Sequence, residues 1–217
     1  MTQAEHPLSA LLQEAARGRF PVPDGTVELL PPLEGKVDAV VAFTAHSAVA
    51  VDLPAGDIRE HLDPGDFGAS MSATFLAWLS DRLGTPPGVL DNVLVAPSRP
   101  AADADIPLVP RDDLAGHPRV ARATRYRSDL HVFTDVSGAG VLLIGRGLAG
   151  RWEMAFEVDG DGRGRGLGRA LAAAAPTLIP EGEYLFAQAS PGNAASVRAV
   201  LAAGYTPIGS EVLFARG

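Results

Sequence analysis

One segment decides the fold: residues 157–171, Glu157-Val-Asp-Gly-Asp-Gly-Arg-Gly-Arg-Gly-Leu-Gly-Arg-Ala-Leu171. Leading into it, Arg151–Val158 alternates apolar and polar side chains, which predicts a strand; a helix is expected over about 167–175. The glycines between them let several backbone N–H groups point into one concavity, and the start of a helix adds partial positive charge. Together the strand, loop and helix predict an anion site suited to a pyrophosphate.

Three other glycine-loop patterns do not fit this segment. The Rossmann spacing fails because Arg169 stands where a glycine is required, and the Walker loop fails because its Gly-Lys-Ser/Thr is absent. Asp159 and Asp161 resemble the start of a calcium loop, but Arg163 stands at the next ligand position. A flexible surface turn remains an alternative for the segment taken alone.

The spacing that remains is R-x-x-G-x-G, in Arg163-Gly-Arg-Gly-Leu-Gly168. It resembles motif A of the GNAT superfamily of N-acetyltransferases, and the strand ending at Val158 stands where that family places one. A second run, Asn193-Ala-Ala-Ser-Val-Arg-Ala-Val-Leu-Ala-Ala-Gly-Tyr205, resembles the family's N-x-x-A/S…G-F/Y motif with its customary spacing. The resemblance covers about residues 111–217.

The resemblance implies a fold and a ligand. The fold is GNAT-like and of the α/β (α+β) class, with a mixed, mostly antiparallel central sheet flanked by helices. The ligand is acetyl-CoA as co-substrate, without a metal. Its pantetheine arm would lie as an added strand where Arg151–Val158 and Tyr184–Ala189 splay apart. The implied cofactor-binding residues are Phe156, Val158, Arg163, Gly164, Arg165, Gly166, Leu167, Gly168, Arg169, Asn193 and Ser196. Asn193 can serve equally as a helix N-cap.

Acyl transfer to an amine also needs groups that move protons. Glu153 and Glu157 share one face of the predicted strand, near the expected thioester, and either is a candidate base or an exposed strand carboxylate. The family often has a tyrosine acid seven residues after the motif's Asn, and this chain has Val200 there. Tyr205 or Tyr184 can take its place as the catalytic acid, or solvent can protonate the thiolate.

Around the motif, hydrophobic patterning predicts further elements. Strands over Asp129–Thr134 and Val141–Gly145 join Arg151–Val158 in an antiparallel meander. Pro118 should divide Arg111–Arg125 into two helical pieces, with Asp112 or Asp113 capping the first. Toward the C-terminus we expect a strand over Tyr184–Ala189, a helix over Ala194–Ala203 and one or two strands within Tyr205–Phe214.

The N-terminal region has its own mixed α/β pattern. Helices are expected over Leu8–Arg17 and Ser70–Leu83, and strands over Thr26–Leu30, Val37–Phe43, Ala48–Leu53 and Asn92–Ala96. The proline-rich Ser98–Pro110 is the candidate boundary loop. The predicted domains are therefore 1–98, of unclear identity, as an extension of the sheet or a degenerate GNAT-like half, and 99–217, the acyl-CoA-binding domain.

Composition narrows the classes of function. A net charge of −8 argues against partners such as nucleic acid or anionic membrane; it favours an amine-bearing substrate, or serves only solubility. The absence of cysteine excludes disulfides and a thiolate nucleophile, and no pair of histidines has metal-ligand spacing. Met1–Phe20 has no signal-peptide pattern, so we expect a cytoplasmic protein. Lys36 as the single lysine suggests a GC-rich bacterial genome.

Three functional hypotheses follow. The first is an N-acetyltransferase that acts on an amine of a small molecule or peptide. The alternative, suggested by Val200, is a non-catalytic acyl-CoA-binding or sensor module. In the third, the N-terminal region binds a partner or forms a homodimer.

Overall fold

A computed structural model describes residues 6–216, and the first five residues of Met1–Phe20, the segment without a signal-peptide pattern, fall outside it. The chain divides into two compact units, unit 1 (residues 1–92 and 208–217) and unit 2 (residues 93–207). This division differs from the predicted one, which has a single boundary near residue 98. The last strand returns to pair with strand 37–43, and Ser98–Pro110 belongs entirely to unit 2.

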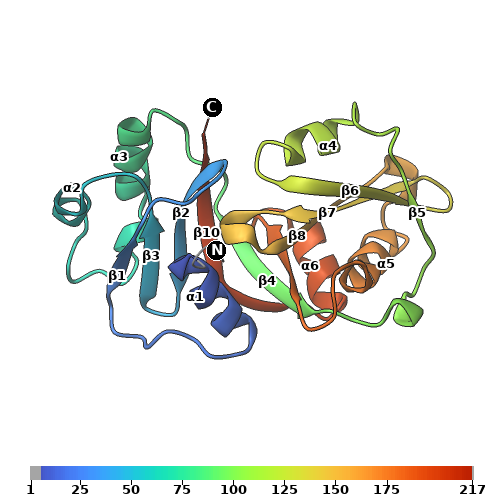
Figure 1. Ribbon diagram of the computed structural model, residues 1–217, viewed down its shortest axis with the longest axis horizontal. Helices are drawn as coiled ribbons and strands as arrows, with labels where there is room; N and C mark the ends of the chain where they lie inside the picture. Colours follow the sequence, from blue (N-terminus) through green and yellow to red (C-terminus); the bar gives the residue numbers. More distant parts are fainter. Residues whose placement is uncertain (1–5, 217) are drawn as a thin grey trace, which may run out of the picture. The chain divides into compact units, whose positions relative to one another are not determined.

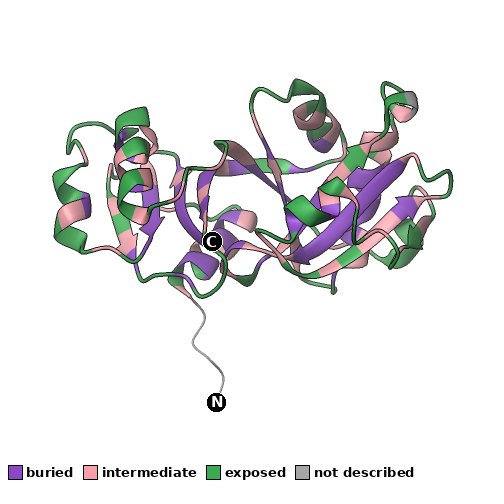
Figure 2. Cartoon of the chain, turned by 90° about the horizontal axis from the view of Figure 1, so that it is seen from above, coloured by how far each residue is buried: buried purple, intermediate pink, exposed green. Residues whose placement is uncertain are grey.

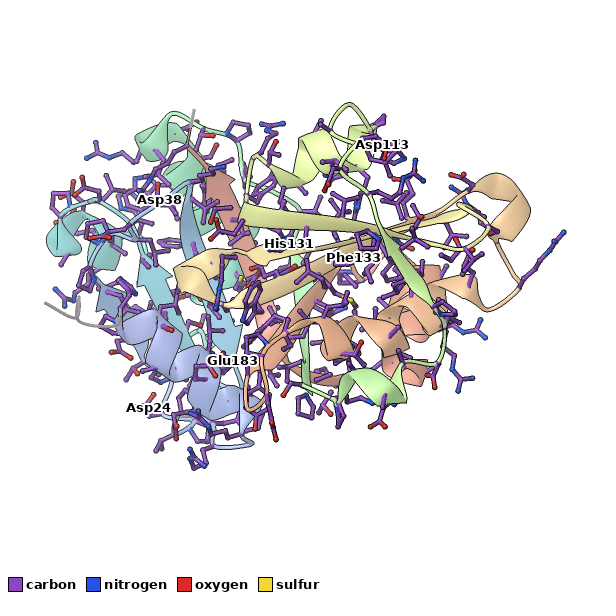
Figure 3. The ribbon with its side chains drawn as sticks, turned by 45° about the vertical axis from the view of Figure 1, so that its right-hand side comes forward. Asp24, Asp38, Asp113, His131, Phe133 and Glu183 are labelled. Atoms are coloured by element: carbon purple, nitrogen blue, oxygen red, sulfur yellow. The ribbon has the colours of Figure 1, made fainter. Side chains whose placement is uncertain are left out.

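Unit 1 is a mixed sheet with helices. Its elements are α1 (Pro7–Ala16), β1 (Val27–Leu30), β2 (Val37–Phe43), β3 (His46–Ala50), α2 (Ala55–Glu60), η1 (Ala69–Met71), α3 (Ala73–Leu83) and most of β10 (Thr206–Ala215). The strand order is β1-β3-β2-β10. β1 runs parallel to β3, and the other two pairings are antiparallel. Phe75 and Leu79 of α3 pack with Val40 of β2 and Phe214 of β10 in one buried cluster. Asp38 of β2 (Figure 3) pairs with Arg216 just after β10.

Unit 2 carries the predicted site. Its elements are most of β4 (Asp91–Pro97), η2 (Ala101–Asp103), β5 (Leu108–Pro110), α4 (Pro118–Ala123), β6 (Ser128–Asp135), β7 (Gly140–Arg146), η3 (Leu148–Gly150), β8 (Trp152–Val158), η4 (Gly160–Gly162), α5 (Leu167–Ala174), η5 (Ala175–Leu178), β9 (Tyr184–Ala189) and α6 (Ala194–Ala202). The strand order is β4-β9-β8-β7-β6-β5. The pairings from β5 to β8 are antiparallel, and β8 and β9 are parallel. The class expected, a mostly antiparallel central sheet flanked by helices, is therefore confirmed.

Helices cover both faces of this sheet (Figure 1). On one face, α5 and α6 close a core in which Leu171 and Val200 pack with Leu142 and Met154 of the sheet. On the other face, Val120 and Ala123 of α4 pack with the strands. Figure 2 shows the central strands as buried between these layers. The alternation of β8 therefore directs Met154, Phe156 and Val158 toward the α5–α6 side.

The structure differs from the sequence predictions at three places. Residues 111–117 form a loop with turns in place of the first helical piece, and the Asp113 carboxylate pairs with Arg111 at 2.7 Å and does not cap a helix. Pro118 instead occupies the first turn of α4, and Nδ1 of His117 caps that helix by accepting from the N–H of Arg119. The loop 98–110 contains the strand β5, and the sequence did not indicate α2.

Candidate functional site

Strands β8 and β9 separate partway along their length. Their parallel register ends at the pair Met154 and Ala187, although β8 stays paired with β7 as far as Val158. The edge of β8 beyond Met154 therefore faces a gap in the sheet.

The backbone of β8 directs peptide groups into this gap at Phe156 and Val158. The N–H of Asp159 donates to the carbonyl of Ala139 at 2.9 Å, which places Asp159 among the residues that bond toward β7. Residues of an antiparallel strand alternate between bonding toward a neighbour and away from it, so Phe156 and Val158 bond away from β7. The carbonyl of Val158 accepts a hydrogen bond from Nε of Arg163 at 3.1 Å.

The glycine loop wraps around the start of α5. Gly164 and Gly166 have φ angles of 74° and 84°, which residues other than glycine rarely adopt. Gly166 is the N-cap of α5 and offers no side chain to the free N–H groups of the first turn. Gly168 packs closely, since a Cβ there would lie 3.1 Å from the ring of Phe156. The loop amides and the positive end of α5 thus lie together beside β8.

A cleft of about 750 Å³ opens at this place. Its wall includes every cofactor-binding residue expected from the sequence except Arg165, which is exposed but does not line it. β8, the glycine loop, α5 and α6 supply most of the wall, and Arg119 of α4 adds to it. The structure therefore brings the two sequence motifs to one cavity.

Helix α6 presents a face of small residues to the cleft. Ala195, Ala199 and Ala202 are spaced so that they share one side of the helix, and all three line the cavity. Oδ1 of Asn193 accepts a hydrogen bond from the N–H of Ser196 at 3.2 Å, so Asn193 caps the helix and also lines the cleft. Sequence reasoning missed the alanines, although their helical spacing after Asn193 was a readable signal.

Positive charge dominates the wall of the cleft. Among the side chains that the structure describes, four arginines line it, Arg119, Arg163, Arg169 and Arg198, against one carboxylate, Glu157. The cleft is therefore lined mostly by cations in a chain whose net charge is −8. Arg119 and Arg198 were not expected from the sequence, because neither stands in the glycine motif.

The two candidate glutamates of β8 meet different surroundings. Glu157 is exposed and lines the cleft. Glu153 is 1% exposed, and its carboxylate lies 2.8 Å from Nε of Arg127 and 2.8 Å from Nε of Arg151. Burial alone would raise the pKa of Glu153, but the charges of Arg127 and Arg151 outweigh it and hold the pKa below its ordinary value. Glu153 is therefore held as an ion-pair partner and is not open to a substrate.

The tyrosine considered as an acid lies in the core. Tyr205 is 3% exposed, with its hydroxyl 3.1 Å from the carbonyl oxygen of Ala172 and 3.3 Å from Sδ of Met154. Burial raises the pKa of this phenol, and the residue does not line the cleft. Val200, where the family often has tyrosine, is also buried.

Within residues 6–216, the part of the chain that the structure describes, no cluster of three or more His, Asp or Glu side chains is arranged to hold a metal ion. No helix there has the length and apolar character needed to cross a bilayer. His131, on β6 (Figure 3), is exposed and stands outside the cleft.

Comparison with known proteins gives distant structural likeness alone. No family model and no curated protein matches the chain. A GNAT-family acetyltransferase from Colwellia psychrerythraea is 14% identical, with 67% of this chain and 63% of that one covered and a TM-score of 0.41. A GCN5-related N-acetyltransferase from Kribbella flavida is 15% identical, with 65% and 63% covered and a TM-score of 0.40. A functionally unknown conserved protein from Staphylococcus epidermidis is 16% identical, with 67% of each chain covered and a TM-score of 0.43. This chain thus spans less than two-thirds of the first two structures, whose names are those of the family that its motifs resemble.

Proposed function

We propose that the protein binds acetyl-CoA or a related acyl-CoA in the cleft of unit 2 and transfers the acyl group to an amine. The observation that carries this proposal is the gap between β8 and β9, which opens directly beside the glycine loop. An extended ligand in that gap would have the peptide groups of β8 along one side and the anion site of the glycine loop at one end. Pantetheine linked to a pyrophosphate has this shape and this order of polar groups.

Each part of the ligand has a matching part of the cleft. The pantetheine arm lies along β8 and bonds to the backbone of Phe156 and Val158, as an added strand does. The pyrophosphate lies on the loop amides at the start of α5, and the cleft arginines add charge-assisted contacts. Asn193 and Ser196 lie beside the arm at the start of α6.

Glu157 is the residue that we assign to the transfer step. A neutral amine attacks the thioester carbonyl, the C–S bond breaks, and the proton lost from the amine passes to the Glu157 carboxylate directly or through water. The departing thiolate takes a proton from solvent, because Tyr205 is enclosed in the core. Much of the rate then comes from holding amine and thioester together. The acceptor is an amine of a small molecule or peptide, and the protein acts in the cytoplasm.

A thiol-release assay tests this function. Full-length protein is mixed with acetyl-CoA and a broad panel of amines, and free CoA is followed with a thiol reagent. We expect amine-dependent release that the Glu157→Gln variant loses. Release without any amine, or equal release by both proteins, contradicts the assignment.

A non-catalytic acyl-CoA-binding module is the second candidate. Burial of both Val200 and Tyr205 favours it, because neither position offers a proton to the thiolate. Saturable CoA binding by calorimetry without thiol release across the panel would select this candidate over the enzyme.

A further inference from the structure

One arginine joins β8 to β9 at the point where the two strands diverge. Nε of Arg127 lies 2.8 Å from Oε2 of Glu153 on β8. Nη2 of the same guanidinium donates to Oε1 of Gln188 on β9 at 2.8 Å. We call Arg127, Glu153 and Gln188 the strand bracket.

The strand bracket straddles the end of the register. Glu153 lies one residue before Met154, the last paired residue of β8, and Gln188 follows Ala187, the last paired residue of β9. The bracket therefore links the strands where backbone pairing stops.

The β8 end of the bracket is held rigidly. The Glu153 carboxylate also accepts from the N–H of Leu148 at 3.1 Å and from Nε of Arg151 at 2.8 Å. Gly147 leaves no free space, since a Cβ there would lie 2.1 Å from the carboxyl carbon. With Glu153 fixed in this way, the bond from Arg127 to Gln188 holds β9 at a set distance.

The width of the gap matters for an inserted chain. Neighbouring strands lie about 4.8 Å apart, so an extended arm between two strands needs roughly twice that separation. A small change in the divergence of β8 and β9 moves the arm away from the peptide groups of Phe156 and Val158. The pyrophosphate site, formed by the loop and α5, does not depend on that width.

We propose that Arg127 is a positioning residue that sets the separation of β8 and β9 and thereby the seating of the acyl-pantetheine arm. This inference rests on the proposed function. Its consequence is a split: the strand bracket governs affinity for the pantetheine part of CoA and the turnover of the bound thioester, while affinity for the nucleotide part is independent of it.

Gln188 offers the cleanest test, because its substitution leaves the Arg127–Glu153 ion pair in place. The variants are Gln188→Leu, which removes the acceptor on β9, and Gln188→Glu, which keeps one. Arg122→Ala is the control, since Arg122 is exposed on α4 and does not line the cleft. Calorimetry uses two probes: CoA, and adenosine bisphosphate, which carries the nucleotide end without pantetheine.

We expect Gln188→Leu to weaken CoA binding roughly fivefold, as the loss of one partly buried hydrogen bond would, and to lower kcat in the thiol-release assay. Its affinity for adenosine bisphosphate should equal that of the parent protein. Gln188→Glu and Arg122→Ala should bind both probes as the parent does. A thermal melt of each variant establishes folding.

Two results would overturn the inference. If Gln188→Leu lost affinity for CoA and for adenosine bisphosphate equally, the substitution would have loosened the whole unit. If folded Gln188→Leu kept the CoA affinity and turnover of the parent, the strand bracket would not set the separation of β8 and β9. If the parent protein binds neither probe, the proposed function fails and the inference falls with it. If the parent binds CoA and only the split is missing, the inference fails alone.

Discussion

Glu153 and Glu157 lie on the same face of β8, and their neighbours give them different chemistry. Glu157 lines the cleft, whereas Glu153 sits between Arg127 and Arg151. The alternation of the strand predicted their shared face. It did not predict burial, because Arg127 and Arg151, which enclose Glu153, lie just before β6 and β8, and strand alternation does not show where their side chains point.

Glu157→Gln should separate binding from transfer. The amide cannot accept the proton of the amine, so we expect kcat to fall about a hundredfold while the CoA dissociation constant stays the same. Steady-state thiol release and calorimetry measure the two quantities. Glu181→Gln, at an exposed loop position, is the matched control. Full activity of Glu157→Gln would remove Glu157 from the mechanism.

Glu153→Gln should act on stability, with a pH signature. The folded state holds the pKa of Glu153 below its ordinary value of 4.5, so the unfolded state takes up a proton first as the pH falls. The stabilisation is present above about pH 4.5 and is lost below it. The variant leaves buried arginine charge uncompensated, which should lower the free energy of unfolding at neutral pH by roughly 3 kcal/mol.

Urea unfolding over a range of pH measures this effect. The stability of the parent should fall more steeply with acidification than that of Glu153→Gln. Parallel pH profiles for the two proteins would show that Glu153 is not held as a carboxylate.

At the scale of elements, the glycine loop and α5 form the proposed anion site. Two glycines of this loop differ in backbone conformation, so substituting one provides a control for substituting the other. Gly166→Ala places a side chain at a φ of 84°, so it should distort the loop and weaken CoA binding about tenfold or more. Gly160→Ala, in the same loop, meets nothing within 4 Å and should bind CoA as the parent does. Calorimetry distinguishes them, and equal affinity for both variants would mean that the loop does not hold the ligand.

Elements with a strong local pattern could be predicted from the sequence. Tyr184–Ala189 is a strand with the expected bounds, and α6 ends one residue before the expected position. The sequence did not predict β5, because its three residues lie among prolines. The strand forms through its pairing with β6, which the local sequence does not show. The sequence offers Asp112 or Asp113 as a helix cap, and it does not show that Asp113 pairs with Arg111.

At the scale of the whole molecule, the division of the chain could not be read from local patterns. β10, near the C-terminus, pairs with β2, and nothing in the sequence of residues 206–215 indicates that β2 is its partner. The charge also divides unevenly. Unit 1 holds 14 of the 26 acidic residues and 6 of the 18 basic ones, which accounts for the net charge of −8. Unit 2 is balanced, so the acidity of the chain says little about the ligand of its cleft.

Unit 1 should depend on β10 for its stability. Phe214 is fully buried with Phe75 and Leu79, so Phe214→Ala should cost about 3 to 5 kcal/mol through lost burial and the cavity left behind. Leu201→Ala removes an exposed side chain and should cost less than about 0.5 kcal/mol. Thermal and urea unfolding compare the two, and similar stabilities would contradict the buried position of β10.

Hydrogen–deuterium exchange of the full-length protein, with and without saturating CoA, tests whether the ligand lies along β8 and the glycine loop. If pantetheine lies along β8 and the pyrophosphate on the loop, CoA should slow exchange at the amides of Phe156, Val158 and residues 164–169, and leave the strands of unit 1 unchanged. CoA binding while these amides exchange at their original rate, or the absence of saturable protection anywhere in unit 2, would contradict this placement of the ligand.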